Sequence, residues 1–143
     1  MMNIAIGGDH AGFEYKEVLI TWLKEQGNEV KDFGPFSNDS CDYSDFAHPL
    51  AQAVANKTYN MGILICGSGN GVCITANKHK DARAALCWEV ELARLARMHN
   101  DANIIGIPAR FVDIEKTKQM IQMFMDKPFE GGRHQNRVNK INI

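Results

Sequence analysis

The sequence predicts a three-layer α/β/α sandwich, in which a five-stranded, parallel, Rossmann-like sheet lies between two layers of helices. Two observations predict it. Short strand-like segments alternate five times with segments of helical spacing, an order that produces a parallel sheet with helices on both faces. The central strand-like segment, residues 61–66, is apolar throughout, as expected of a strand covered on both faces. The length of 143 residues and the hydrophobic fraction of 45% suit one core, so residues 1–143 are expected to form a single domain.

The first strand is expected at residues 3–7, where the sequence N-I-A-I-G is short and apolar. Residues 8–12 follow as a tight turn. A helix is expected at residues 13–26, because apolar side chains recur there at helical spacing and Gly27 follows as a C-terminal stop. Its inward stripe is expected to contain Val18, Leu19, Trp22 and Leu23.

The second strand is expected at residues 29–33, where polar and apolar side chains alternate. Residues 34–44 are rich in turn-forming residues and are expected to be a loop. The second helix follows at residues 45–56, with Pro49 in its first turn, where proline is tolerated. Its inward side chains are expected to be Leu50, Ala53 and Val54.

The third strand is expected at residues 61–66, and a third helix starts near Gly71 after a glycine-rich loop. Residues 82–87 and 103–107 are expected to be the fourth and fifth strands, with a helix at residues 89–99 between them.

The last long helix is expected at residues 114–126, because Asp113 is a favourable N-cap residue and Lys127-Pro128 ends the pattern. Its inner side is expected to contain Ile114, Met120, Ile121 and Phe124. The tail, residues 127–143, is too polar to extend the main core. It is expected to contain a short helix with Val138 and Ile141 on one side, and to dock on its own surface or on a partner.

The composition excludes several classes of function. A net charge of −1 provides no general basic field for nucleic acid or for a membrane surface. The N-terminal sequence lacks the features of a secretory signal, and no segment approaches the roughly 18 apolar residues of a membrane span. The four cysteines form no C-x-x-C pair and no zinc-site spacing, so we expect a cytoplasmic protein without disulfides or metal.

The glycine-rich loop at residues 67–71, G-S-G-N-G, is the strongest candidate for a functional site. Glycines permit a tight turn, and free N–H groups at the start of the following helix would bind an anion. The loop lacks the lysine of an ATP-binding P-loop. Val72 stands where a dinucleotide motif needs glycine, and where a cysteine phosphatase of the C-x5-R type needs arginine. A small anion or a developing oxyanion remains.

Cys66 ends the strand before this loop, and its chemical role is open. For an arbitrary cysteine, a buried and inert residue is the better interpretation. However, ligands of parallel sheets bind beyond the carboxyl ends of strands, where the loop's N–H groups could activate the thiol. Asp9 and His10 hold the same place after the first strand, so the first and third strands are expected to be neighbours. Cys73 and Cys87 are interpreted as packing residues and Cys41 as incidental.

Other candidates keep two interpretations each. His99 is either a cation favoured by the end of its helix or an acid/base group that titrates near pH 7. Arg133 and Arg137 are spaced four residues apart, so on a helix they share one face. That face is either solvated or a site for a phosphate dianion. His48 and His79 are expected at the surface.

Taken together, these residues resemble the ribose-5-phosphate isomerase type B family and its relatives, the galactose-6-phosphate and allose-6-phosphate isomerases. The resemblance covers almost the whole chain. The motifs that carry it are I-A-I-G-G-D-H-A-G-F, D-Y-S-D-F-A, G-I-L-I-C-G-S-G-N-G, A-N-K, H-N-D-A-N and G-G-R-H-Q-N-R-V, in this order. Six motifs in order are far more specific than any one of them.

The resemblance implies interconversion of D-ribose 5-phosphate and D-ribulose 5-phosphate without a metal or an organic cofactor. Cys66 would move a proton between C2 and C1 through a cis-enediolate, and His99, with Asp9, would open the sugar ring. The loop would stabilise the enediolate oxygens. The remaining implied contacts are His10, Arg110, Arg133 and Arg137 for the phosphate, Tyr43 and Asn100 for the sugar, and Gly67, Gly69 and Gly71 in the loop.

The resemblance also implies a homodimer or homotetramer with active sites at subunit interfaces. Two positions depart from many relatives: Ser68 replaces a threonine and keeps the hydroxyl of a catalytic residue, and Asn70 replaces an apolar residue where the sugar passes. The closest alternative is the same reaction on a hexose 6-phosphate. A non-catalytic phosphosugar-binding protein is a further alternative, although simple binding needs no base.

Overall fold

The computed structural model describes residues 1–143 and confirms the predicted five-stranded, parallel sheet. The strand order is β2-β1-β3-β5-β4, and every neighbouring pair is parallel. The predicted adjacency of the first and third strands is therefore correct. The strands are β1 (Asn3–Gly8), β2 (Glu29–Asp32), β3 (Met61–Cys66), β4 (Ala84–Leu86) and β5 (Ile104–Pro108).

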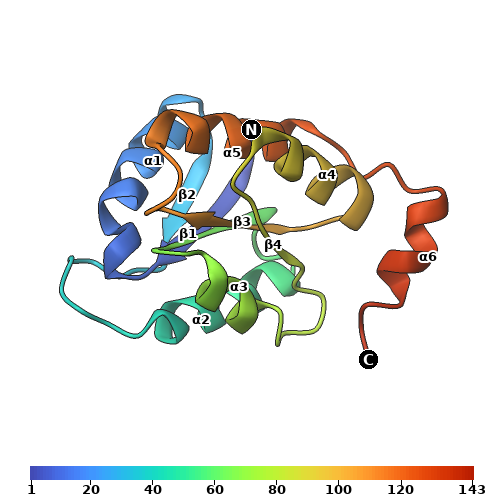
Figure 1. Ribbon diagram of the computed structural model, residues 1–143, viewed down its shortest axis with the longest axis horizontal. Helices are drawn as coiled ribbons and strands as arrows, with labels where there is room; N and C mark the ends of the chain where they lie inside the picture. The colour runs from blue at the N-terminus through green and yellow to red at the C-terminus, as the bar shows by residue number, and fades with distance from the viewer.

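Helices cover both faces of the sheet (Figure 1). α1, α4 and α5 pack on one face, and α2 and α3 pack on the other. The helices are α1 (Phe13–Glu25), α2 (Tyr43–Ala55), α3 (Asn70–Ala76), α4 (Val90–Asn100), α5 (Ile114–Asp126) and α6 (Arg133–Asn139), with a 3-10 helix η1 (His10–Gly12) after β1. None of them is long and apolar enough to cross a bilayer.

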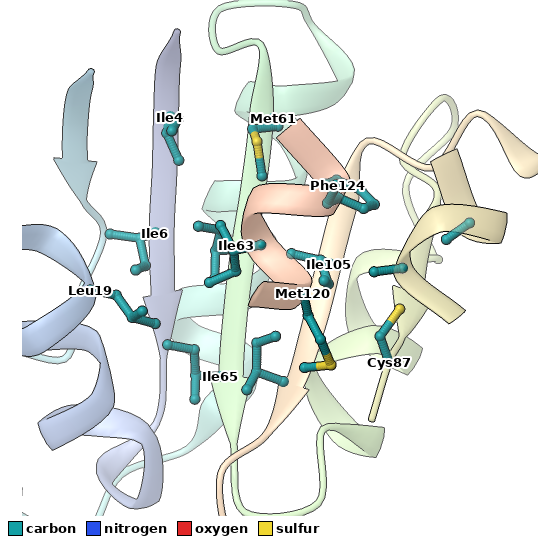
Figure 2. Close-up of a cluster of buried hydrophobic side chains, with 14 of the residues drawn as sticks. Ile4, Ile6, Leu19, Met61, Ile63, Ile65, Cys87, Ile105, Met120 and Phe124 are labelled. Atoms are coloured by element: carbon teal, nitrogen blue, oxygen red, sulfur yellow. The ribbon is translucent and has the colours of Figure 1, made fainter. Parts of the chain in front are cut away.

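The core divides into one cluster on each face of the sheet, because successive strand residues point to opposite sides. Figure 2 shows the larger cluster, in which Leu19, Met120 and Phe124 from the helices pack on Ile63 and Ile105 from the central strands. Ala5, Leu64 and Cys66 point to the opposite face and pack against α2 and α3. The central strands are thus buried on both sides, as the apolar sequence of β3 predicts.

Three predicted details of the three layers are wrong. Val18 is 46% exposed, and Lys16 takes an inward position on α1, where its Nζ lies 2.8 Å from Asp32 Oδ2. The helical pattern did not reveal this exchange because a lysine can be buried when a carboxylate pairs with it. α2 begins at Tyr43, two residues earlier than predicted, so Pro49 lies in the helix interior. β4 contains only three residues of the predicted residues 82–87.

The C-terminal helix α6 stands apart from the three layers (Figure 1). It contacts α4, and its Val138 is buried, as predicted for the inward side of a short helix. Ile141, predicted on the same side, lies beyond the end of the helix and is 51% exposed. After α6, Asn142 Nδ2 donates to Asp81 Oδ1 at 2.7 Å. The tail therefore folds against its own chain but adds little to the main core.

Candidate functional site

The carboxyl ends of β1, β3 and β5 meet at a cavity of about 510 Å³. Open parallel sheets bind ligands at this edge, where the loops after neighbouring strands converge. Most of the predicted site residues in the first two-thirds of the chain lie here. The cavity is lined by Asp9, His10, Ala11, Tyr43, Cys66, Gly67, Ser68, Gly71, Arg110 and Phe111.

Cys66 is the last residue of β3 and is only 4% exposed. The backbone N–H of Gly69 donates to Cys66 Sγ at 3.1 Å. The turn that brings this N–H to the sulfur requires Gly69 to adopt a left-handed conformation, with φ of 76°, which glycine adopts without steric cost. An N–H directed at the sulfur stabilises negative charge on it.

The loop also presents N–H groups that the chain itself does not use. Those of Gly67, Ser68 and Gly71 donate no hydrogen bond to another group of the protein. The N–H of Asn70, by contrast, donates to Ser68 Oγ at 3.3 Å. Free, fixed N–H groups beside a thiol can stabilise an oxyanion formed there, because their dipoles are already oriented.

Tyr43 packs directly on the start of α3. A Cβ atom added to Gly71 would lie 2.4 Å from the Tyr43 ring, so this position accepts no larger residue unless the ring moves. The early start of α2 puts Tyr43 at its first turn, above the loop. The aromatic ring therefore forms one wall of the cavity, next to the free N–H groups.

Asp9 and His10 form another wall of the cavity. Asp9 is 8% exposed, and its Oδ1 accepts from the N–H groups of Ala11 at 2.9 Å and Gly12 at 3.2 Å, which caps η1. His10 Nδ1 accepts from the backbone N–H of Cys41 at 3.3 Å. Cys41, which the sequence suggested to be incidental, thus contacts a site residue through its main chain. No sequence pattern marks such a contact, because any residue except proline can make it.

Arg110 follows β5 and crosses the glycine loop. Its N–H donates to the Gly67 carbonyl at 3.0 Å, and its guanidinium group lies over Gly67. No carboxylate lies within ion-pair distance of Arg110. An unpaired guanidinium group at the mouth of the cavity is well suited to bind a phosphate.

The other predicted site residues lie at the opposite edge of the sheet. α4 ends at Asn100, just before β5 begins at Ile104. Because β5 is parallel to β3 and Ile104 pairs with Gly62, the end of α4 lies near the edge where these strands begin. His99 and Asn100, together with Arg133 and Arg137 on the neighbouring α6, are therefore separated from Cys66. Within one chain, the structure does not bring His99 to Asp9.

His99 stacks on His134 of α6, with ring centroids 4.2 Å apart and an angle of 14° between the rings. Glu130 lies beside both, with Oε2 3.7 Å from His99 Nε2 and Oε1 3.8 Å from His134 Nε2. His134 is 4% exposed, and its Nε2 is the one buried side-chain polar atom without a hydrogen bond. Burial, followed by the neighbouring His99, lowers the pKa of His134, which favours the neutral ring.

His99, His134 and Glu130 are all residue types that commonly bind metals, and their ligand atoms lie close together. An imidazole binds a metal ion in the plane of its ring. The two rings are stacked and nearly parallel, so a single ion cannot lie in both planes. The arrangement fits a stacked support for His99 better than a metal centre.

The remaining cysteines and histidines lie away from the cavity. Burial raises the pKa of both Cys73 and Cys87 to about 12, which fits the prediction that they are packing residues. His48 is exposed, as expected, and His79 is half-buried; His48 Nδ1 lies 2.7 Å from His79 Nε2. Burial, followed by His48, lowers the pKa of His79.

Comparisons with known proteins agree with the sequence motifs. The family model described as Ribose/Galactose Isomerase matches residues 4–141. Ribose-5-phosphate isomerase B of Escherichia coli is 43% identical over 141 residues, which cover 99% of this chain and 95% of the E. coli protein. A probable ribose-5-phosphate isomerase B of Mycoplasma pneumoniae is 45% identical over 139 residues, covering 96% and 91% of the two chains.

Solved structures show the same similarity. A ribose 5-phosphate isomerase of Thermotoga maritima has a TM-score of 0.96 and 43% identity, with 99% of this chain and 97% of that chain covered. Ribose-5-phosphate isomerase B of Mycoplasma genitalium, solved with bound ribulose-5-phosphate, has a TM-score of 0.93 and 41% identity, with 97% and 93% covered.

Proposed function

The chain belongs to the Ribose/Galactose Isomerase family, and from this premise we propose that it interconverts D-ribose 5-phosphate and D-ribulose 5-phosphate. The chain is similar, over almost the full length, to proteins named ribose-5-phosphate isomerase B or probable ribose-5-phosphate isomerase B. This similarity supports a pentose phosphate as the substrate. The observation that carries the proposal is the cavity itself, where a thiol that accepts a backbone N–H lies beside three unused N–H groups.

Cys66 acts as the base in this proposal. Its thiolate takes the proton from C2 of the open-chain aldose, and the electron pair of the C–H bond forms the enediolate. The sulfur returns the proton to C1, while the hydroxyl proton moves from O2 to O1. No electrons leave the substrate, so the step needs no redox partner. The N–H of Gly69 at 3.1 Å from the sulfur supports this role, because it stabilises the thiolate.

The loop of residues 67–71 acts as the oxyanion hole. Negative charge develops on O1 and O2 as the enediolate forms, and the free N–H groups of Gly67, Ser68 and Gly71 would stabilise that charge. Ser68 adds a hydroxyl, and its Oγ already accepts from Asn70 N–H at 3.3 Å. The loop is therefore proposed to hold the reacting oxygens and not the phosphate.

We extend the proposal to a homodimer or a homotetramer in which each active site uses two chains. His99, Asn100, Arg133 and Arg137 would reach the cavity of a second copy, where His99 would act with the partner's Asp9 in ring opening. Three features support this. The four residues lie at the end of the sheet opposite their own cavity. The helix α6 stands apart from the three layers of its own chain. Arg133 and Arg137 are exposed and form no ion pair within the chain.

The phosphate is proposed to bind between the two chains. His10 and Arg110 would contact it from one side, and Arg133 and Arg137 of the second copy from the other. Arginines without carboxylate partners support this, since a phosphate dianion provides the missing counter-charge. Tyr43 and Asn70 would border the sugar. We place the reaction in the cytoplasm, because all four cysteines are free thiols, which suits a reducing compartment.

Isotope exchange tests this proposal directly. The protein is incubated with D-ribose 5-phosphate in D2O, and NMR follows deuterium entry at the carbons next to the carbonyl. Exchange together with formation of ribulose 5-phosphate is expected. Absence of exchange with this and with hexose 6-phosphates would contradict an isomerase, whereas a preference for a hexose phosphate would overturn only the substrate.

A cysteine pair provides the matched control. Cys66→Ala is expected to abolish exchange while the phosphosugar still binds. Cys73→Ala removes a thiol that burial keeps protonated, and it is expected to retain exchange. Exchange at the normal rate in Cys66→Ala would remove Cys66 as the base.

A further inference from the structure

The two ring nitrogens of His10 have different environments. The backbone N–H of Cys41 donates to Nδ1 at 3.3 Å, and Cys41 Sγ lies 3.9 Å from the same atom. His10 Nε2 forms no hydrogen bond within the chain. The ring lines the same cavity as Cys66 and Arg110. One nitrogen is therefore held by the protein, while the other is left for a ligand.

The identity of the partner fixes the position of the proton. A backbone N–H can only donate, so Nδ1 must be the acceptor and cannot carry hydrogen while this bond exists. A neutral imidazole has one N–H, which is then on Nε2. We infer that the main chain of Cys41 positions His10 by holding its ring in the Nε2–H tautomer, which presents a hydrogen-bond donor to an oxygen of the phosphosugar. The other tautomer would direct a lone pair at that oxygen.

The chain on both sides of this contact is fixed. On the His10 side, Asp9 Oδ1 caps η1 and holds the backbone of the histidine. On the loop side, Asp32 accepts from Gly34 N–H at 2.8 Å through Oδ1 and from Lys16 Nζ at 2.8 Å through Oδ2. Lys16 is 1% exposed, so the start of the loop is attached to the interior of the protein.

Between these attachments, residues 35–40 form a single side-chain hydrogen bond, from Asp39 N–H to Ser37 Oγ. The contact at His10 is therefore where the second half of the loop is tied to the rest of the molecule. Because the main chain makes this contact, the amide of residue 41 matters more than its thiol. The inference rests on the proposed function only for the identity of the ligand, since the tautomer can be measured without any substrate.

The tautomer is read by NMR in protein labelled with 15N in its histidine rings, at about pH 8.5, where an ordinary imidazole is neutral. His10→Gln assigns the signal. We expect His10 of the native protein to show a protonated Nε2 and an unprotonated Nδ1. Cys41→Pro, which lacks the N–H, is expected to give a mixture of tautomers. Cys41→Ala keeps the N–H and is expected to keep the native signature.

Kinetics give the second measurement. The KM of Cys41→Pro for D-ribose 5-phosphate is expected to exceed that of Cys41→Ala by about fivefold to tenfold, the effect of losing one oriented hydrogen bond. The two kcat values are expected to differ less than the KM values, because the contact positions a binding group and does not act in proton transfer.

A protonated Nδ1 in the native protein overturns the inference, and so does an unchanged tautomer in Cys41→Pro. Where proline disturbs the loop, a backbone ester at residue 41 replaces the N–H by oxygen without restricting φ, and it is expected to give the same mixture. If the native protein has no isomerase activity, the proposed function fails while the NMR result still decides the tautomer.

Discussion

The thiol of Cys66 and the imidazole of His99 belong to opposite edges of the sheet in one chain. Cys66 ends β3 and pairs with Pro108 at the end of β5, whereas His99 precedes the start of β5 at Ile104. The two ends of a parallel sheet are separated by the full length of its strands. Under the proposed mechanism, which needs both groups, a second copy of the chain would complete the catalytic centre.

This relationship predicts complementation between inactive variants. Cys66→Ala and His99→Asn are each expected to be inactive alone, but subunit exchange between them should restore about a quarter of the native activity. Random pairing makes about half of the dimers mixed, and one of the two sites in each mixed dimer keeps both native groups. Activity is measured after mild denaturation and joint refolding of the two variants.

The matched control combines two substitutions from the same edge. Cys66→Ala mixed with Asp9→Asn should recover nothing, since every site in such a dimer lacks one of the two groups. Equal recovery in both mixtures would contradict a site shared between chains.

The packing of Tyr43 on Gly71 predicts a stability effect that a second substitution removes. Gly71→Ala is expected to lower the free energy of unfolding by about 1–3 kcal/mol, because its Cβ would overlap the Tyr43 ring. In a Tyr43→Ala background, the same change should have a much smaller effect. Urea denaturation of the four proteins measures the coupling, and additive effects would rule out this contact as the cause.

His134 predicts loss of stability on acidification. Burial lowers its pKa in the folded state, so the unfolded chain binds a proton more readily. Stability is therefore expected to fall as pH decreases below about 6.5, the ordinary pKa of histidine. In His134→Gln, the urea concentration at the midpoint of unfolding should fall less steeply as the pH is lowered. His79 acts in the same direction, so His79→Gln provides a second, separate reduction. An unchanged slope in both variants would refute this account.

Arg137 is expected to contribute to binding and not to proton transfer. Arg137→Ala should raise the KM for a sugar phosphate by about 10- to 100-fold, the effect of losing a charge-assisted hydrogen bond, with a smaller change in kcat. Arg137→Lys should recover part of the affinity through its charge. Gln135→Ala is the control on the same helix, because the side chain of Gln135 hydrogen-bonds only to Asn139. A KM that stays at the native value in Arg137→Ala would exclude it from the phosphate site.

Sequence patterns could predict the layers of this fold because burial leaves a clear trace. The apolar residues of β3 and the spacing of α5 follow directly from which faces are covered. The exchange between Val18 and Lys16 left no such trace, since it depends on Asp32 from a different element. The start of α2 was missed because Asp42 and Tyr43 look like a continuation of the polar loop.

The candidate site shows the same division. Cys66 and the glycine loop could be found from their order along the chain, since a strand followed by three glycines has few other uses. The contact between Cys41 and His10 could not be found in this way, because every residue type except proline has a backbone N–H that can make it. The support of His99 by His134 was also hidden, since it depends on how α6 folds back on α4.

The extended position of α6 has a consequence for activity at low concentration. Under the shared-site proposal, a single chain keeps its sheet and the thiol of Cys66. Its cavity has only two of the four side chains that would bind the phosphate, and it lacks the partner's His99. Dilution below the dissociation constant of the dimer should therefore remove turnover while circular dichroism stays constant. A single chain would thus be folded but inactive. At the lowest concentrations in a cell, the amount of active dimer would depend on the square of the chain concentration.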